Sequence, residues 1–471
     1  MNTNSPDLLR SFRRAYSDDG FNPDIATETI AACLQRGDAA PLRAWFAQAL
    51  AVDIADALDR LEPAHLAAAL LLIPAQEQAH VFGYLPLGRQ TRLVAGMSRA
   101  DVIELLGRMS SDERADLFNT LPEGREALLP ALAQAQRDDI RNLASYEQGS
   151  VGAIMNSQYA TLAPELTAAE AFDELRRVAP DSETIYNAYV VDEQRRLIGV
   201  TTLRRLILAP PSARLADMMQ ASPVTAFVDD DQQVAAEKIA RYDFIALPVV
   251  DREHRLVGIV TADDAMDVME AEATEDFVKS GGSLGHWPLR MKDATVRLLY
   301  RKRVFWLVLL VFANIFSGAG IAHFENLIAA NVALVFFLPL LIDSGGNAGS
   351  QSATLMVRAL ATGDVQLRDW ASMLGRELMV AALLGLTMAV AVSMVGLVRG
   401  GVAVALAVAL TMQVVVVVGS VIGMSLPFLL SRFKADPASA SSPLITTIAD
   451  ASGIFIYFAI ASRILPQFAA G

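Results

Sequence analysis

The sequence is nearly devoid of cysteine, with Cys33 the single one among 471 residues, and it has five histidines. One cysteine cannot form an internal disulfide or a site built from several thiolates. The N-terminal segment, MNTNSPDLLRSFRRAYSDDG, lacks an apolar core of signal-peptide length, so we expect the first membrane helix to direct insertion, with nothing cleaved. The net charge is −13 and no basic face is evident, which argues against nucleic-acid binding.

Apolar residues are distributed unevenly along the chain. Up to about residue 300 the composition is that of a soluble protein and includes most of the acids. Beyond that point, five apolar runs are long enough to cross about 30 Å of hydrocarbon at about 20 residues each. These runs cover residues 304–322, 327–350, 373–398, 402–430 and 444–465. The sequence therefore predicts a multi-pass membrane domain over 301–471, attached to a soluble half.

Basic residues gather on alternate loops of the predicted membrane domain. They precede the first run and lie between runs two and three and between four and five: Arg301, Lys302, Arg303, Arg358, Arg368, Arg376, Arg432 and Lys434. The opposite loops carry little beyond Arg399 and His323. By the positive-inside rule, the N-terminal half lies in the cytoplasm and the C-terminus lies outside.

The soluble half begins with a twelve-residue repeat. It covers residues 61–132 and includes five consecutive units: IPAQEQAHVFGY, LPLGRQTRLVAG, MSRADVIELLGR, MSSDERADLFNT and LPEGREALLPAL. Each opens with a large apolar residue and a helix-starting Pro or Ser, and each carries an apolar pair later. Such units bury their faces only by stacking. We therefore expect an all-α superhelical domain over 1–147.

A second duplication follows. RRLIGVTTLRRL at 195–206 matches HRLVGIVTADDA at 254–265, and each copy alternates β-rich apolar runs with helical stretches. This pattern resembles a tandem pair of CBS domains, here 148–212 and 213–270, which sense ligands. In that family a Gly-x-x-Thr/Ser-x-x-Asp segment holds a nucleotide ribose. The second copy has Gly258, Thr261 and Asp264, with Phe244 as a candidate adenine contact, but Arg205 replaces the acid in the first, which weakens the ATP prediction.

An acidic segment joins the sensor pair to the membrane domain. Six carboxylates lie within thirteen positions: Asp264, Asp267, Glu270, Glu272, Glu275 and Asp276. Carboxylates this dense repel one another unless a cation lies between them. Hard oxygen ligands favour Mg²⁺ or Ca²⁺, and Mg²⁺ keeps several waters. An ordinary solvated acidic helix is the alternative; the position between a sensor and a membrane domain favours divalent-cation sensing by a connecting helix within 271–300.

The second and fifth membrane runs contain polar residues at depth. Asp343 lies in the second, within DSGGNAGSQ, and Asp450 lies in the fifth, within TTIADASG. An ionisable residue inside a span is costly and usually faces a pore or polar interior. Asp450 is therefore the strongest candidate for an ion-binding residue, whereas the glycines serve close helix packing, carbonyl exposure, or both.

The order of helical array, CBS pair, acidic connector and five spans resembles the MgtE magnesium channel family over nearly the whole chain. The strings MEAEATEDF, SGGNAGSQSATLMVRALATGD and PLITTIADASG carry the local resemblance. It implies a homodimer in a bacterial-type inner membrane whose ion path lies between subunits. It places Mg²⁺ at Asp450, with Gly346, Gly349, Thr446 and Gly453 lining the pore, and it implies cytoplasmic sensor acids at Asp112, Asp116, Asp231, Asp243, Asp264, Asp267, Glu272, Glu275 and Asp276.

The function expected is passive Mg²⁺ influx that cytoplasmic Mg²⁺ closes, and not an enzymatic one. One alternative is a secondary divalent-cation transporter coupled to Na⁺ or H⁺. Another is an intramembrane aspartyl protease that uses Asp343 and Asp450. Ser442 stands where the family has an asparagine near the pore mouth, which leaves the selectivity among divalent cations open.

Overall fold

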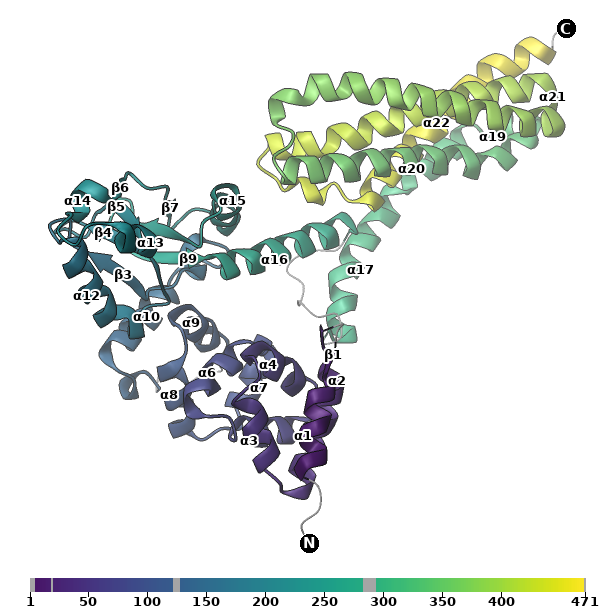
Figure 1. Ribbon diagram of the computed structural model, residues 1–471. Coiled ribbons are helices and arrows are strands. Elements are labelled where there is room, and N and C mark those ends of the chain that lie inside the picture. The colour runs from purple at the N-terminus through teal and green to yellow at the C-terminus, as the bar shows by residue number, and fades with distance from the viewer. Residues whose placement is uncertain (1–4, 18–19, 122–127, 283–293, 470–471) are drawn as a thin grey trace. The chain divides into compact units, whose positions relative to one another are not determined.

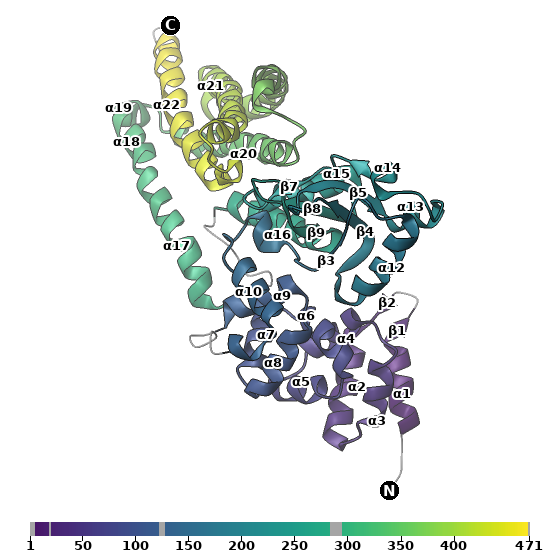
Figure 2. The ribbon, with the colours of Figure 1, turned by 90° about the vertical axis from the view of Figure 1, so that its left-hand side faces the viewer.

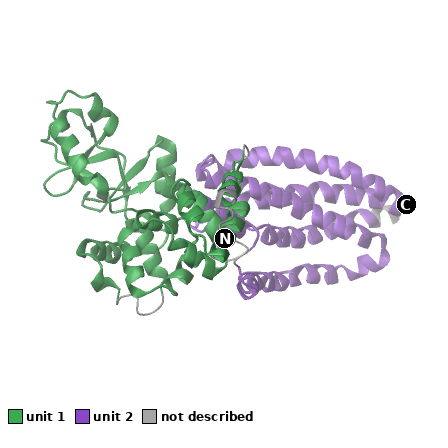
Figure 3. Cartoon of the chain, turned by 60° about the horizontal axis from the view of Figure 1, so that its bottom comes forward, with its two compact units in different colours: residues 1–269 green, residues 270–471 purple. Residues whose placement is uncertain are grey.

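The computed structural model describes residues 5–17, 20–121, 128–282 and 294–469 (Figure 1). The chain forms two compact units, residues 1–269 and 270–471 (Figure 3). The first is a helical array followed by an α/β pair, and the second is helical throughout its described part. This is the multidomain architecture that the sequence predicts.

The N-terminal part of the first unit is an array of short helices. It contains a two-stranded ribbon of β1 (Tyr16–Ser17) and β2 (Gly20–Phe21). The helices are α1 (Ser5–Arg14), α2 (Pro23–Arg36), α3 (Ala40–Phe46), α4 (Ala51–Asp59), α5 (Pro63–Leu70), α6 (Ala75–Gly83), α7 (Leu87–Val94), α8 (Arg99–Arg108), α9 (Ser111–Thr120), the 3-10 turn η2 (Leu129–Ala131) and α10 (Gln134–Leu143).

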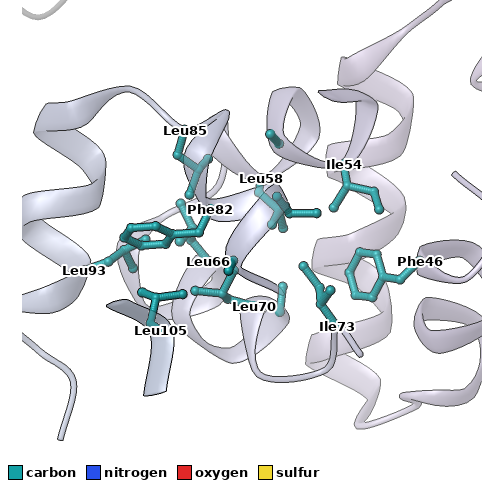
Figure 4. Close-up of a cluster of buried hydrophobic side chains, with 14 of the residues drawn as sticks. Phe46, Ile54, Leu58, Leu66, Leu70, Ile73, Phe82, Leu85, Leu93 and Leu105 are labelled. Carbon is teal, nitrogen blue, oxygen red and sulfur yellow. The ribbon is translucent and has the colours of Figure 1, made fainter. Parts of the chain in front are cut away.

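The twelve-residue repeat is the origin of helices α6 to α9, because their first residues fall twelve positions apart. Pro74 and Pro86 stand immediately before α6 and α7, and the Ser98 hydroxyl caps α8 by accepting from the backbone of Asp101. The apolar faces meet in one continuous core, part of which Figure 4 shows. The predicted stacking is confirmed for four units, and residues 122–127 of the fifth lie outside the described part.

Each copy of the α/β pair contains a strand, a helix, two strands and a further helix in that order, which agrees with the predicted alternation of strands and helices (Figure 2). The first copy comprises α11 (Val151–Ile154), β3 (Tyr159–Leu162), α12 (Ala168–Val178), the turn η3 (Ala179–Asp181), β4 (Thr184–Val191), β5 (Leu197–Thr202) and α13 (Leu203–Leu208). The second comprises α14 (Leu215–Met218), β6 (Gln220–Ala221), β7 (Ala226–Phe227), α15 (Gln232–Tyr242), β8 (Ala246–Val250), β9 (Leu256–Thr261) and α16 (Ala262–Ser280).

The two copies exchange short backbone segments, one of them a strand and the other an isolated bridge. β6 of the second copy pairs antiparallel with β5 of the first, and Asn156, which precedes β3, pairs with Ile259 in β9. A Cβ on Gly199 or Gly258 would collide with Met219 or Met155 respectively, so a matching Gly–Met contact marks each crossing. The exchange locks the copies together and fixes the backbone around Asn156.

The second unit holds the membrane-length helices. Within it lie α17 (Val296–Ala313), α18 (Ile315–His323), α19 (Glu325–Ala330), α20 (Ala333–Ala361), the turn η5 (Leu367–Asp369), α21 (Trp370–Arg432), the turn η6 (Pro437–Ser439) and α22 (Ser442–Ala469). Four segments of its described part are long and apolar enough to cross a membrane: 296–323, 333–361, 367–432 and 442–465.

The third of these segments is two spans rather than one. Its 66 residues would extend about 100 Å as a straight helix at 1.5 Å per residue. Gly401 breaks it with φ 74° and ψ −171°, a backbone region open essentially to glycine. The Gln413 side chain donates to the Ala382 carbonyl at 3.2 Å, so the two halves fold back on each other. Five membrane-length segments result, as predicted.

The second span differs from its predicted limits. The apolar run predicts 327–350, but residues 325–330 form the separate helix α19, and α20 continues to Ala361. The polar string SGGNAGSQS therefore lies in the middle of a helix rather than at its end. Hydropathy misplaced the boundary because the polar side chains occupy part of the helix surface without ending the helix.

Candidate functional sites

A group of carboxylates gathers in the first unit where α9, the approach to β4 and the start of α16 meet. The Asn156 amide donates to Asp112 Oδ1 at 2.9 Å and to Glu183 Oε2 at 3.0 Å. The Ser111 hydroxyl donates to the Asn156 side-chain oxygen at 2.9 Å, which fixes that amide's orientation. Asp264 belongs to the same group and accepts from the Thr261 hydroxyl at 2.5 Å. The strand exchange thus supplies the residue around which the acids assemble.

The electrostatics of this group favour loss of negative charge. Burial, followed by the neighbouring Asp112, raises the pKa of Asp264 to about 8. Burial also raises the pKa of Asp112, and Asp263 adds to that effect. The pKa of Glu113 rises to about 7 because of burial and then Asp112. A proton or a cation would relieve the repulsion among these carboxylates.

The buried cation Arg114 interacts electrostatically with Asp112, but its hydrogen bonds go to other partners. The Arg114 guanidinium donates to the carbonyls of Leu106 and Met109 and lies 3.6 Å from Asp139 Oδ2. Within the described part of the chain, no group of three or more His, Cys, Asp or Glu side chains is arranged to hold a bare metal ion. The arrangement suits a hydrated cation, whose bound waters would bridge the longer gaps between carboxylates.

The structure separates the predicted sensor acids into distinct places. Asp112 and Asp264 come together, Asp116 follows one turn after Asp112, and Asp267 lies exposed one turn beyond Asp264 on α16. Sequence reasoning missed Glu113, Glu183 and Asp263. Glu113 and Asp263 adjoin predicted residues, whereas nothing in the sequence near Glu183 indicates its approach to α9.

Asp231 and Asp243 lie at the two ends of α15. The Asp231 carboxylate accepts from the backbone N–H of Gln233 at 2.8 Å and caps the N-terminus of the helix. Asp243 ends it in a left-handed conformation with φ 53°. Each thus has a local role at a helix terminus.

The candidate nucleotide residues have protein partners of their own. The Thr261 hydroxyl bonds to Asp264, so the two groups of the ribose motif engage each other. Phe244 is half-buried against the core and stacks on Tyr242 with ring centroids 5.4 Å apart. Arg205 donates to the Met218 carbonyl at 3.0 Å. In the second copy, Asp264 therefore belongs to the acidic group and is bonded to Thr261, which leaves its carboxylate less available to a ribose.

A second acidic group lies at the C-terminal end of α16, inside the second unit. Burial, followed by Asp436 in the loop between α21 and α22, raises the pKa of Asp276 to about 6. Glu272 and Glu275 add to this effect, and Lys279 opposes it. Three of the predicted connector acids thus share one environment with an acid that the sequence reasoning did not select.

Two membrane helices bring polar stripes together. Asp343, Asn347 and Ser350 recur at helical spacing on α20, and Ser442, Thr446 and Asp450 do so on α22. The Ser442 hydroxyl donates to Ser350 Oγ at 2.9 Å. A Cβ on Gly346 would lie 3.3 Å from Asp450 Oδ1 and 3.2 Å from Thr446 Cγ2, so this glycine gives Asp450 room beside α20.

The remaining polar and glycine positions divide between this face and the helix packing. The Asn347 amide donates to Asp343 Oδ2 at 3.0 Å, and both side chains are exposed in the single chain. Gly349 instead packs on the Gly419 carbonyl of α21, and Gly453 packs near Val415 and Ile342. Of the predicted pore residues, the structure therefore groups Gly346, Thr446 and Asp450 and places Gly349 and Gly453 in packed contacts.

Family models match three parts of this architecture. A model described as MgtE, divalent cation transporter, matches residues 338–460, and the MgtE intracellular N domain matches 50–149. CBS domain models match 151–212 and 215–271.

Individual proteins are similar over most of the chain. The magnesium transporter MgtE of Thermus thermophilus is 38% identical over 92% of this chain and 97% of its own length. That of Bacillus subtilis is 30% identical over 88% and 94%. A crystal structure of the soluble part of a magnesium transporter is 28% identical, with a TM-score of 0.50 over 53% of this chain and 99% of that one.

Proposed function

The chain belongs to the MgtE family, it is a multi-pass membrane protein and not an enzyme, and from this we propose that it carries Mg²⁺ into the cell through a path at Asp450. The observation that supports this most directly is the meeting of the polar stripes of α20 and α22 at Gly346, Thr446 and Asp450. Asp450 is the carboxylate of α22 on that face, and a divalent cation there offsets the cost of burying its charge.

Mg²⁺ sheds its waters reluctantly, so the path should accept the ion largely hydrated. The Asp450 carboxylate, the Thr446 hydroxyl and the amide of Asn347 offer hydrogen-bonding groups to such waters. Asp343 acts electrostatically on Asp450 and adds negative potential along the same face. We place the face at the centre of a homodimer, because the side chains of Asp343 and Asn347 are exposed in the single chain.

The driving force is the membrane potential. A potential of 100 mV, negative inside, is worth about 2.3 kcal/mol per charge, and so about 4 to 5 kcal/mol for a divalent ion. With the N-terminus in the cytoplasm of a bacterial-type inner membrane and the C-terminus outside, the basic loops and both acidic groups face the compartment that the ion enters. No coupling ion is then required.

The acidic groups act as the Mg²⁺ sensor in this proposal. Asp112, Asp116, Asp264 and Asp267 form its part in the first unit, and Glu272, Glu275 and Asp276 form its part at the end of α16. Cytoplasmic Mg²⁺ would relieve their repulsion, stabilise the closed arrangement and so inhibit entry. The Thr261–Asp264 bond and the surrounding acids favour a cation over ATP at the second CBS copy.

The test is Mg²⁺ uptake into proteoliposomes under an imposed inside-negative potential with no Na⁺ or H⁺ gradient. We expect uptake by the parent, its loss in Asp450→Ala, and its retention in Asp364→Ala, which removes an exposed carboxylate from the loop after α20. Neutralising Glu272, Glu275 and Asp276 together should relieve inhibition by internal Mg²⁺. Uptake that appears only with a Na⁺ or H⁺ gradient would favour the coupled transporter instead.

A further inference from the structure

The last turn of α16 is held within the second unit by a two-sided ion pair. The Lys279 ammonium lies 2.5 Å from Asp436 Oδ2 and 2.7 Å from Glu275 Oε1. The side chains are largely withdrawn from solvent, with exposed fractions of 25% for Lys279, 21% for Glu275 and 33% for Asp436. Partial burial makes such a pair less sensitive to salt than a pair on the open surface.

Both ends of this link are themselves fixed. Asp436 caps the turn η6, because its other carboxylate oxygen accepts from the Ala438 backbone at 2.8 Å. Immediately after α16, a Cβ on Gly282 would lie 2.9 Å from the Trp306 ring and 3.2 Å from Pro443, so the backbone there passes against α17 and α22. The end of α16 is thus held both by charge and by packing.

Without Lys279, the carboxylates at the C-terminal end of α16 would repel one another and the carboxylate of Asp436. The carboxylates of Asp436, Glu272 and Glu275 repel that of Asp276, and the ammonium of Lys279 attracts it. Lys434, in the same loop as Asp436, is exposed, and among the described residues it is Lys279 that pairs with the acids of this group. The ammonium of Lys279 therefore offsets part of the negative charge of this group, and a divalent cation would offset the rest.

We propose that Lys279 is a built-in cation that keeps the C-terminal end of α16 anchored to the α21–α22 loop whether or not Mg²⁺ is present. This rests on the proposed function, in which Mg²⁺ acts on both acidic groups, and it adds a fixed positive charge at the second of them. Lys279 is a positioning residue in this scheme, and it makes the end of α16 a pivot. Gating then moves the helix about this end without detaching it.

The test is a distance measurement that does not depend on transport. Spin labels are placed at Phe277→Cys on α16 and Phe433→Cys at the end of α21, both strongly exposed positions, in a Cys33→Ser background. Labelled protein is diluted with unlabelled protein so that only distances within one chain contribute. We expect one narrow distance distribution for the parent, the same in EDTA and in Mg²⁺.

Three variants make the measurement decisive. Lys279→Met should lose the narrow distance in EDTA and regain it in Mg²⁺, whereas Lys279→Arg and the matched control Lys434→Met should behave as the parent. Lys279→Met combined with Asp436→Asn should recover part of the narrow distance in EDTA. An unchanged distance in Lys279→Met, or equal broadening in Lys434→Met, would overturn the anchor. Failed Mg²⁺ uptake with these distances intact would instead overturn the proposed transport function alone.

Discussion

At the scale of single residues, function and packing compete for the same glycines. Gly346 leaves space beside Asp450, whereas Gly419 and Gly423 let α21 approach the backbone of α20 so closely that a Cβ on either would fall on a carbonyl oxygen, of Gly345 and Gly349 respectively. Backbone cannot rotate away as a side chain can. These contacts fix the height and rotation of α20, and so the direction in which its polar stripe faces.

Gly423→Ala should therefore destabilise the membrane unit by about 1 to 3 kcal/mol, because the added methyl group overpacks a contact between two backbones. Gly375→Ala is the matched control on the same helix, since its Cβ would meet nothing within 4 Å. Thermal unfolding of the detergent-solubilised chain should show a lower midpoint for the first variant only. Equal midpoints would mean that the two helices separate easily.

Asp264 gives the first unit a specific dependence on pH. Its pKa is about 8 in the folded protein against an ordinary value of 3.8, so the folded state retains a proton that the unfolded state releases between these values. Its contribution to stability is present at low pH and is lost as the pH rises toward 8. The full effect between pH 6 and 8 is at most about 2 to 3 kcal/mol, and solvent screening reduces it.

Asp264→Asn cannot ionise and should therefore be stabilised relative to the parent as the pH rises. Thermal unfolding at pH 6 and pH 8 should show a larger difference between the two proteins at pH 8. Mg²⁺ at pH 8 should raise the midpoint of the parent more than that of the variant. A difference that does not change with pH would contradict the raised pKa.

At the scale of elements, Asp231 caps the N-terminus of α15, although the resemblance in sequence matches it to a sensor position. Asp231→Ala should cost about 1 kcal/mol, because the N-terminal N–H groups lose their acceptor, whereas Asp231→Ser supplies another acceptor and should cost little. Unfolding midpoints distinguish the two variants. Both should keep the parent's inhibition by internal Mg²⁺, and relief of inhibition in the serine variant would assign the carboxylate to the sensor.

The hairpin within α21 depends on the conformation of one residue. Gly401→Ala forces a side chain into a backbone region that L-residues rarely adopt, at a cost of about 1 to 3 kcal/mol. Gly318→Ala, in a helix with open space around it, is the control. The expected result is a lower unfolding midpoint or a lower yield of folded protein for Gly401→Ala alone.

At the scale of the whole molecule, the five membrane-length segments of the described part of the chain predict that the two termini lie on opposite sides of the membrane. Epitope tags at the N- and C-terminus can be tested with protease in sealed vesicles of the two orientations, and each tag should be digested in only one of them. We expect the N-terminal tag to be accessible in inside-out vesicles and the C-terminal tag in right-side-out vesicles. Accessibility of both tags in the same preparation would require an even number of crossings.

The sequence alone was sufficient for features that depend on periodicity and composition. The twelve-residue repeat predicts α6 to α9, the internal duplication predicts the α/β pair, and the apolar runs predict the membrane segments, because each signal lies within a short stretch of chain. Asp450 also stands out in sequence, since an acid within an apolar run is costly wherever the chain folds.

Only the tertiary structure decided which acids meet. Asn156 links Glu183 to Asp112, which lies 71 residues earlier in the chain. Asp436 meets Asp276 and Lys279 across about 160 residues of chain. No local pattern encodes such meetings, because they depend on how strands exchange and helices pack. Helix packing also decides the surroundings of Gly346 and Gly349. The two glycines lie three positions apart on α20, but Gly346 lies beside Asp450 whereas Gly349 packs against α21.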